Sequence, residues 1–525
     1  MILDLNKEVE SALECDAQIC IIGAGTAGIF LAKLLSERGF QVVILESGGL
    51  NSRLQPQEDD EYEQLGKSYR GASHGRSFGL GGTSVLWGGQ MIPLMESDMC
   101  ARPEVGLDAW PIKYAQLLPY YDLIRSSMGL RKLKISHKKR PFSWLSDFSG
   151  SFSLRFSEWL PFKKRNFYKA FASIFDEDNV TVWLNATVVS MSRSNNTQEA
   201  VINQITAKSP SGRLLQVRPQ IVVVCAGALE STRLLLEFDD STSQSITCFG
   251  APLGRYFSDH LSKPCGRFDI LDRKKMNLLI GPTFKDGIML SPRFELAHEL
   301  QKKLKLTSAF AHLIAIGNEG SGFDLVRSLL RRMQGEKLKV DINVKKLLNL
   351  SIDIMKIIYW RLWYKRLWLP DSAQLLLYID IEQLPNFDSH LMLTEAIDKN
   401  GRKKLGIDWR ITQYDADVIG RVAQIFVREW QNSPLSNVAQ LSTNAFENTS
   451  SINSPYDVYH PTGALRMGTD RSNSVVDKNL CLWGTSNCYV SSTAVFPSAG
   501  SANPGMTHLA LTAKLADHIV DKISK

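Results

Sequence analysis

The fold is decided by residues 18–46, which read QICIIGAGTAGIFLAKLLSERGFQVVILE. Residues 18–23 form a short apolar run typical of a buried strand, and residues 41–46 form a second one. The stretch between them carries apolar residues at helical spacing as far as Gly39. A strand, a helix and another strand within this length predict a β-α-β unit whose two strands run parallel.

Three glycines at the start of the expected helix, Gly23, Gly25 and Gly28, form the fingerprint G-x-G-x-x-G. The first permits a sharp turn, the second lets a pyrophosphate approach the backbone, and the third lets the helix lie close to the strand. The helix start then offers free N–H groups and a positive dipole to the phosphates. Glu46 ends the second strand, where a carboxylate can accept the hydroxyls of an adenosine ribose. An acid there disfavours NADP, so NAD and FAD both remain open.

Length and composition limit the class of protein. A chain of 525 residues exceeds what one hydrophobic core usually supports, so we expect two associated domains. A net charge of +7 is too small for this length to indicate a nucleic-acid partner. No run of eighteen apolar residues is present, which excludes a spanning helix. The eight cysteines form no C-x-x-C pair, so we expect no metal site. Their low density and the absence of a leader indicate a cytoplasmic protein with reduced thiols.

The later parts of the chain alternate in pattern. Residues 178–233 are rich in strands and run into a helix that we expect to start near Glu230. Longer helices and alternating strands dominate from about 263 to 420, and a final helix closes the chain. We therefore predict a mixed α/β fold, in which a Rossmann-like nucleotide domain of discontinuous segments holds an inserted substrate domain built on an antiparallel sheet with helices. The predicted boundaries are 1–93, 178–262 and 456–525 for the nucleotide domain, 94–177 for a connecting or cap segment, and 263–455 for the substrate domain.

The segment 341–369 has an unusual composition, because aromatic residues alternate closely with lysine and arginine in IMKIIYWRLWYKRLWL. This pattern describes either a helix lying on a membrane surface or a helix packed over the substrate domain with its basic side chains reaching into water. We favour the packed helix and keep a peripheral membrane contact through 341–369 as the alternative.

Six further stretches resemble the glucose–methanol–choline (GMC) oxidoreductases, a family of FAD enzymes. They occur in the order that the family shows, and the region from about 300 to 375 is the least similar. The stretches are GLGGTSVLWGG (79–89), VVVCAGALESTRLLL (222–236), LGRYFSDH (253–260), EQLPNFDSHLML (382–393), HPTGALRMG (460–468) and FPSAGSANPGMT (496–507). The resemblance implies that the cofactor is FAD.

The resemblance also implies which residues bind FAD. Val188 corresponds to the residue whose backbone contacts adenine, and Ala226 belongs to the turn that passes beside the cofactor. Ser492 stands where many relatives carry an aspartate that binds the ribityl or phosphate part. Relatives that attach the flavin covalently use a histidine near Leu86 or Trp87, so we expect a noncovalent flavin, with His74 upstream as the alternative attachment point. The glycine-rich segment contributes Gly82, Thr83, Gly88 and Gly89.

The same resemblance places the chemistry at His460 and Asn503, which match the two catalytic positions of the family. A histidine suits the removal of a hydroxyl proton because its pKa lies near neutrality. His508 falls within an apolar helical pattern, so we expect it to pack, and we expect a structural role for His260.

The implied reaction is oxidation of a CH–OH group, of a sugar, glycoside or polyol, by hydride transfer to flavin N5 with His460 as base. The alternatives are an FAD-containing lyase of the same fold and a non-catalytic flavoprotein at a membrane surface. The electron acceptor stays open between oxygen, a quinone and a redox protein.

Overall fold

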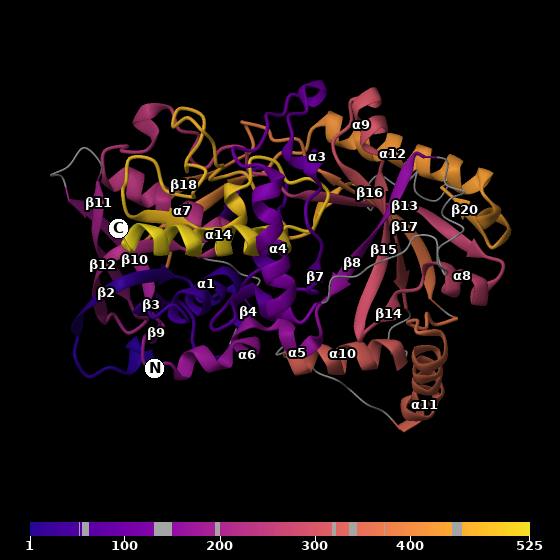
Figure 1. Cartoon of the computed structure of the whole chain (residues 1–525), viewed down its shortest axis with the longest axis horizontal. Coiled ribbons are helices and arrows are strands. Elements are labelled where there is room, and N and C mark those ends of the chain that lie inside the picture. Colours follow the sequence, from indigo (N-terminus) through magenta and orange to yellow (C-terminus); the bar gives the residue numbers. More distant parts are fainter. Residues whose placement is uncertain are drawn as a thin grey trace.

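Two β-sheets lie side by side along the long axis of the molecule, and both chain termini lie at the end that holds the first sheet (Figure 1). The computed structural model describes residues 1–51, 53–54, 62–130, 150–194, 200–317, 322–334, 344–371, 373–443 and 454–524.

The first sheet has a parallel core. Its order is β1-β9-β3-β2-β12-β11-β10, and β22 pairs with β12. The strands from β1 to β12 and β22 run parallel, whereas β10 and β11 form an antiparallel extension of β12. Every residue of β3 is buried, as its unbroken apolar run requires of a strand covered on both faces. The bounds are β1 (Ile2–Asp4), β2 (Ala12–Ile22), β3 (Val42–Leu45), β9 (Val180–Leu184), β10 (Thr187–Ser194), β11 (Val201–Lys208), β12 (Leu214–Val224) and β22 (Cys488–Val490).

Helices cover this sheet. The first, α1 (Thr26–Ser36), connects β2 to β3 and confirms the predicted β-α-β unit. The closing helix α14 (Gly505–Ile523) packs against α1 and against α4 (Tyr114–Met128). The helix after β12, α7 (Gly227–Ser241), begins three residues before the expected Glu230, because the chain turns directly after the strand at Ala226.

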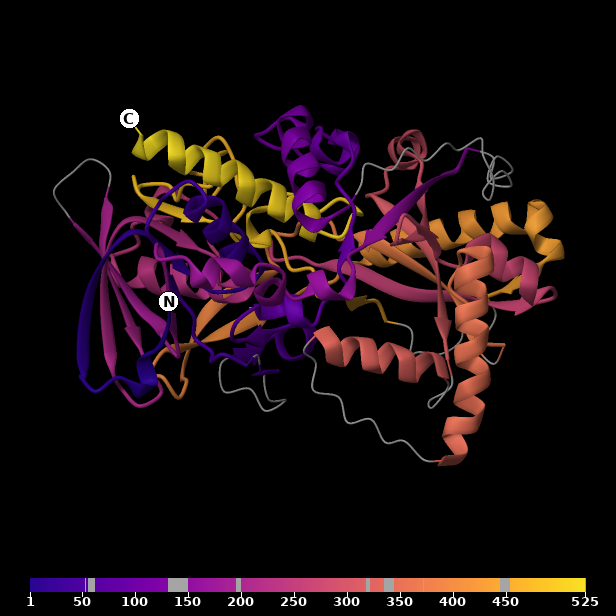
Figure 2. The ribbon, with the colours of Figure 1, turned by 60° about the horizontal axis from the view of Figure 1, so that its bottom comes forward.

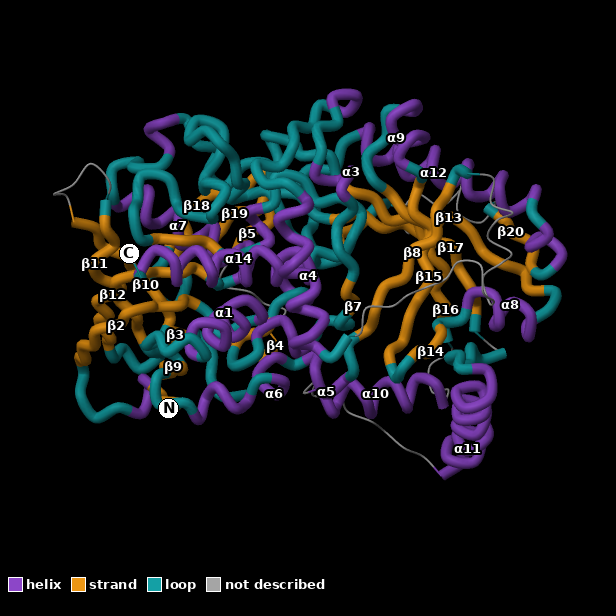
Figure 3. Tube along the Cα trace, in the orientation of Figure 1, coloured by secondary structure: helices purple, strands orange, loops and turns teal. Residues whose placement is uncertain are grey.

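The second sheet is antiparallel, as predicted for the substrate domain, and its order is β20-β13-β17-β16-β15-β8-β7 (Figure 3). The long helix α12 (Gln413–Asn432) packs on β13, β16 and β17. The bounds are β7 (Gln90–Met91), β8 (Phe152–Trp159), β13 (His260–Ile270), β15 (Ile288–Leu296), β16 (Ala309–Ile316), β17 (Gln374–Glu382) and β20 (Ala439–Ser442).

Several strands of this sheet come from segments that we assigned elsewhere. β7 belongs to the predicted 1–93 segment, β8 to the 94–177 segment, and β21 (Tyr456–Asp457), which pairs with β13, to the 456–525 segment. A third, small sheet joins β5 (Tyr62–Gln64) to β18 (His390–Ile397) and β19 (Lys403–Asp408). Chain segments therefore cross between the two large sheets repeatedly, and the predicted division into domains stays a prediction.

Two helices, α10 (Gly322–Gln334) and α11 (Val344–Tyr359), lie outside both large sheets, and a π-helical turn at Trp360–Tyr364 follows α11 (Figure 2). The first three residues of the predicted 341–369 segment fall outside the described residues. In the part of the chain that the structure describes, no helix has the length and apolar character needed to cross a membrane. Shorter elements are α2 (Gly71–His74), α3 (Glu96–Met99), α5 (Phe162–Arg165), α6 (Phe167–Ala170), α8 (Arg273–Ile280), α9 (His298–Leu304), β4 (Arg53–Leu54), β6 (Ser77–Phe78) and β14 (Thr283–Lys285).

Candidate active site

A cavity of about 670 Å³ lies beside the carboxyl ends of β2, β3 and β12, where open α/β sheets bind their ligands. It brings together many of the residues that the sequence predicted to bind a cofactor. Those that line it are Gly23, Gly25, Glu46, Gly82, Thr83, Val188 and Ala226.

The glycine turn at Gly23 has the geometry that a dinucleotide site needs. Gly23 has a φ of +106°, and a Cβ there would lie 2.7 Å from the carbonyl oxygen of Cys225. A Cβ on Gly28 would lie 1.9 Å from the Gly23 oxygen, so α1 sits against the strand end only because that position is glycine. A Cβ on Gly25 would meet no atom within 4 Å, because this position faces the cavity. The backbone there is open to a phosphate, so the residues present fit a dinucleotide.

The carboxylate of Glu46 is fixed by the backbone around it. Its oxygens accept hydrogen bonds from the N–H groups of Ala24 at 2.8 Å, Gly48 at 2.8 Å and Gly79 at 2.9 Å. Burial raises the pKa of Glu46, although these three hydrogen bonds oppose the shift. The side chain therefore ties the glycine turn at residue 24 to the glycine-rich segment at residue 79 from one edge of the cavity.

Three of the other predicted cofactor residues have different neighbours. A Cβ on Gly88 would lie 3.1 Å from the Trp159 ring, and one on Gly89 would lie 2.9 Å from Cγ of Arg165. The hydroxyl of Ser492 accepts a hydrogen bond from the N–H of Ala494 at 3.2 Å and is buried. None of the three is among the residues lining the cavity, and their contact with the cofactor stays a prediction.

His508, which we expected only to pack, lines the cavity. Its Nε2 atom is buried and has no hydrogen-bond partner among the described residues. Burial lowers the pKa of His508 to about 4, although the backbone of Ser491 opposes the shift, so the ring is neutral at neutral pH. An unpaired buried polar atom at a cavity wall is costly unless a ligand forms a hydrogen bond with it. A ribityl hydroxyl has the required chemistry.

His460 and Asn503 meet in space although 43 residues separate them. The Asn503 Nδ2 lies 3.4 Å from the His460 Nε2. On its other side, the His460 ring contacts His260, with 3.0 Å between their Nδ1 atoms and the ring planes almost perpendicular. His260, for which we expected a structural role, therefore touches the predicted base directly.

The hydrogen-bond chain determines which nitrogen of His460 carries the proton. The carbonyl of Gly500 can only accept, so the His260 Nε2, 2.6 Å away, carries a hydrogen. Burial lowers the pKa of His260, and in a neutral ring the Nδ1 is then an acceptor. The His460 Nδ1 must donate to it, which leaves the His460 Nε2 with a free lone pair facing Asn503.

Arg293, from β15, fixes the orientation of the Asn503 amide. Its Nη1 donates to the Asn503 Oδ1 at 3.1 Å and its Nη2 donates to the Ser501 carbonyl at 2.5 Å. The guanidinium is buried, pairs with Glu295 at 2.8 Å and lies over the Phe310 ring. Because the amide oxygen is taken by an arginine, the amide N–H groups of Asn503 point toward His460.

Two buried carboxylates hold the loops that carry these side chains. The Asp259 Oδ2 accepts the His460 backbone N–H at 2.8 Å and the Tyr69 hydroxyl at 2.8 Å. Glu382 accepts the Gly500 N–H at 2.8 Å and forms a two-pronged ion pair with Arg102, at 2.5 and 2.8 Å. The positions of both loops are thus set by side chains from the second sheet and from the connecting segment.

Burial, followed by the nearby His260, lowers the pKa of His460 to about 3. The imidazole is consequently neutral at physiological pH and able to accept a proton. The carboxylate of Asp380 acts in the opposite direction, since it favours the protonated ring.

Comparisons with known proteins agree with this geometry. Residues 385–512 match the family described as GMC oxidoreductase, and residues 16–54 match an FAD binding domain. The chain is thus similar to the GMC oxidoreductases over about a quarter of its length, near the carboxyl end. It is an FAD-dependent oxidoreductase acting on CH–OH donors.

Two solved structures share the fold of this chain. Pyridoxine 4-oxidase from Mesorbium loti is 16% identical, with a TM-score of 0.61 over 96% of this chain and 99% of that one. Formate oxidase from Aspergillus oryzae RIB40 is 14% identical, with a TM-score of 0.58 over 97% and 99%. No curated protein matches the sequence significantly.

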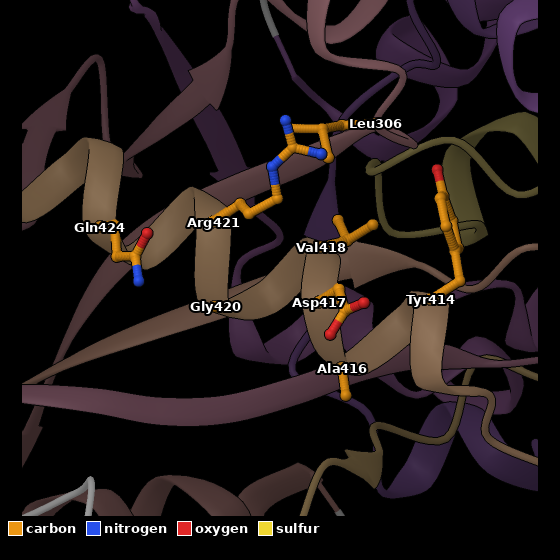
Figure 4. A pocket seen from close by; sticks show the side chains of 8 residues that line it. All are labelled: Leu306, Tyr414, Ala416, Asp417, Val418, Gly420, Arg421 and Gln424. Carbon is orange, nitrogen blue, oxygen red and sulfur yellow. The ribbon is translucent and has the colours of Figure 1, made fainter.

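Another hollow, about 350 Å³, lies along α12 (Figure 4). Tyr414, Asp417 and Arg421 line it, and none of its lining residues belongs to the predicted site. We assign it no part in the chemistry.

Sequence reasoning missed three residues of the enzyme's site. Arg293 lies in an ordinary strand pattern, and its partner Asn503 follows 210 residues later. His260 contacts a residue 200 positions away. His508 lies in an apolar helical pattern, and the sequence does not show which side of that helix faces the cavity. His260 was the only one with a signal, because it ends the family-like stretch LGRYFSDH.

Proposed function

We propose that the protein oxidises the CH–OH group of a sugar, glycoside or polyol, with His460 as the base and Asn503 as the second catalytic residue. The observation that supports this proposal is the hydrogen-bond chain from Gly500 through His260 to His460. That chain leaves an unprotonated Nε2 facing an amide whose N–H groups point toward it.

FAD supplies the acceptor for the hydride of the carbinol carbon, at its N5 atom, when it is bound. Gly23, Gly25 and Glu46 would hold its dinucleotide part, and His508 would form a hydrogen bond with it. An exposed His74 and the presence of Leu86 and Trp87 at the family's attachment position favour a noncovalent flavin.

The residues of the chain handle the proton and the oxygen. The His460 Nε2 takes the hydroxyl proton of the substrate, which converts the neutral ring to an imidazolium. Asn503 donates an N–H to the same oxygen and stabilises the charge that develops on it. Arg293 prevents rotation of the Asn503 amide, and Asp380 stabilises the protonated His460 ring. Both side chains are partly buried, which limits the access of water to the pair and strengthens both interactions.

Polar groups near His460 support a polyhydroxyl substrate. Asp380, from β17, pairs with His312 at 3.3 Å, and its Oδ1 atom has no hydrogen-bond partner among the described residues. Burial alone would raise the pKa of Asp380, but His312 and Arg293 lower it overall, so the carboxylate is charged. A charged carboxylate with a spare lone pair is suited to accepting hydrogen bonds from the additional hydroxyls of such a substrate.

The test is an anaerobic bleaching screen of the purified yellow protein with sugars, glycosides, polyols, hydroxymethyl pyridines and aliphatic alcohols. We expect one of the polyhydroxyl classes to bleach the flavin, and His460→Ala to bind the flavin but to bleach at least about a thousandfold more slowly. His298→Ala, which changes an exposed histidine at the start of α9, outside the site, is the matched control. A protein that turns over an alcohol substrate without bleaching would be a lyase, and bleaching by His460→Ala at the wild-type rate would refute the assigned base.

A further inference from the structure

The helix α11 and the π-helical turn after it carry an exposed apolar stripe. Ile352 is 52% exposed, Met355 62%, Ile358 51%, Tyr359 51%, Leu362 62% and Trp363 74%. The spacing of these residues puts them on one face of the helix. The rings of Tyr359 and Trp363 stack within that face at 6.2 Å. The packed arrangement that we favoured for this segment therefore does not cover this face.

The other side of α11 is attached to the body of the protein. Arg361 lies over the Phe284 ring, 3.1 Å from its centroid, and Lys356 pairs with Asp371 at 3.1 Å. Arg366 is buried and donates to the Gly281 carbonyl at 2.7 Å. These contacts attach the helix, which lies at the edge of the second sheet (Figure 2), and they leave the apolar stripe exposed.

The charge of the surrounding segment identifies what would cover the stripe. Residues 322–369 contain eleven lysines and arginines against four aspartates and glutamates, a net charge of +7. The whole chain also carries +7, so the remaining 477 residues are electrically balanced. The excess positive charge of the chain is thus carried by the segment of the sequence that also carries the exposed apolar stripe with its tyrosine and tryptophan.

We propose that this face docks on the surface of a bilayer that contains anionic lipids. Apolar side chains would enter the region between headgroups and acyl chains, where tryptophan and tyrosine are favoured. Those lysines and arginines of the segment that are exposed would lie among the anionic headgroups and be attracted by their charge. A second copy of the chain is a poorer occupant, because a symmetric contact would bring two segments of +7 together.

The docking surface is connected to the cofactor region. Gln334, the last residue of α10, is buried, and its Nε2 donates to the carbonyls of Ser84 at 3.1 Å and Trp87 at 2.9 Å. The Asn166 amide donates in turn to the Gln334 carbonyl at 3.0 Å. Docking through this segment would hold the glycine-rich turn at Gly82–Val85 close to the bilayer.

The experiment is co-sedimentation of the full-length flavoprotein with phosphatidylcholine vesicles, with and without phosphatidylglycerol. We expect pelleting only with the anionic vesicles at low salt, and release at about 1 M salt, where charges are screened within about 3 Å. The triple variant Ile358→Ser, Leu362→Ser, Trp363→Ser should partition at least about tenfold less. A control variant, Leu50→Ser, Leu118→Ser, Leu271→Ser, removes three exposed leucines elsewhere and should bind as the wild type does.

Flavin absorbance and gel filtration accompany each variant. If the triple variant does not fold, the single change Trp363→Ser tests the same point, with an expected fall of a few fold. The proposal is overturned if the wild type stays in solution with anionic vesicles, or if the variant binds as well as the control. It is also overturned if removing the stripe turns a dimer into a monomer, since the occupant would then be a second copy. A soluble alcohol should bleach the flavin equally well in both variants. A failure of the membrane proposal can therefore be distinguished from a failure of the proposed reaction.

Discussion

Replacing His260 with alanine is the most direct test of the tautomer inferred for His460. The change removes the only acceptor that the described residues offer to the His460 Nδ1, and it leaves that N–H without a partner in a partly buried position. Losing the partner of a buried polar group costs about 1–3 kcal/mol. His460 then gains that free energy by moving its proton to Nε2, which is the atom that must be unprotonated to act as a base.

A bias of that size corresponds to a fall of about 5- to 150-fold in the rate of the proton step. We therefore expect the rate constant for anaerobic flavin reduction, measured by stopped flow per bound flavin, to fall by about that factor in His260→Ala. Substrate affinity should be almost unchanged. His260→Gln places an amide oxygen near the same position and should recover part of the rate.

A purely structural His260 would give a different result. Its loss would lower the melting temperature or the flavin content, but the protein that still holds flavin would be reduced at the wild-type rate. A wild-type reduction rate per bound flavin in His260→Ala would refute the inferred tautomer of His460.

Other features make further predictions. The proposed base acts in its neutral form, and the pKa of His460 is lowered to about 3. The limiting rate of flavin reduction should therefore stay level from pH 8 to about pH 5 and fall only at more acidic pH. A fall centred near pH 6.5 would contradict the burial of the ring. Gly25→Ala should fold with a near-normal melting temperature but lose most bound flavin, because its Cβ would project into the cavity. Gly28→Ala should destabilise the fold itself, because its Cβ would lie 1.9 Å from the Gly23 oxygen. Thermal melts and flavin absorbance distinguish the two outcomes. Glu382→Ala leaves Arg102 unpaired in the interior and should lower the free energy of unfolding by about 3–5 kcal/mol in denaturant titrations; equal stability would show that the pair is unimportant.

Local patterns grouped Gly23, Gly25 and Glu46 as one candidate site, and in the structure all three line the same cavity. Gly23, Gly25, Gly28 and Glu46 fall within one strand–helix–strand unit, so their relative positions follow from the regular geometry of that unit. The register between β2 and β3 then brings the end of one strand beside the end of the other. Such sites can be inferred without knowledge of the rest of the chain.

The reacting half could be predicted only where a family motif exists. His460 and Asn503 lie in such motifs, but their orientations depend on Arg293 and His260, which other strands bring from some 200 residues away. The periodicity of a sequence indicates which side of a strand is buried, but it does not indicate which loop contacts that side. The tautomer of His460 is therefore a property of the tertiary fold alone.

The hydrogen bonds of Gln334 also bear on how a bound flavin would be reoxidised. On one side of Gln334 lies the glycine turn at Gly82 and Thr83, which borders the cofactor cavity, and on the other side lies the helix pair that carries the exposed stripe. If the stripe docks on a bilayer as proposed, an oxidant dissolved in the lipid would meet the flank of the protein that Gln334 links to the border of the cofactor cavity.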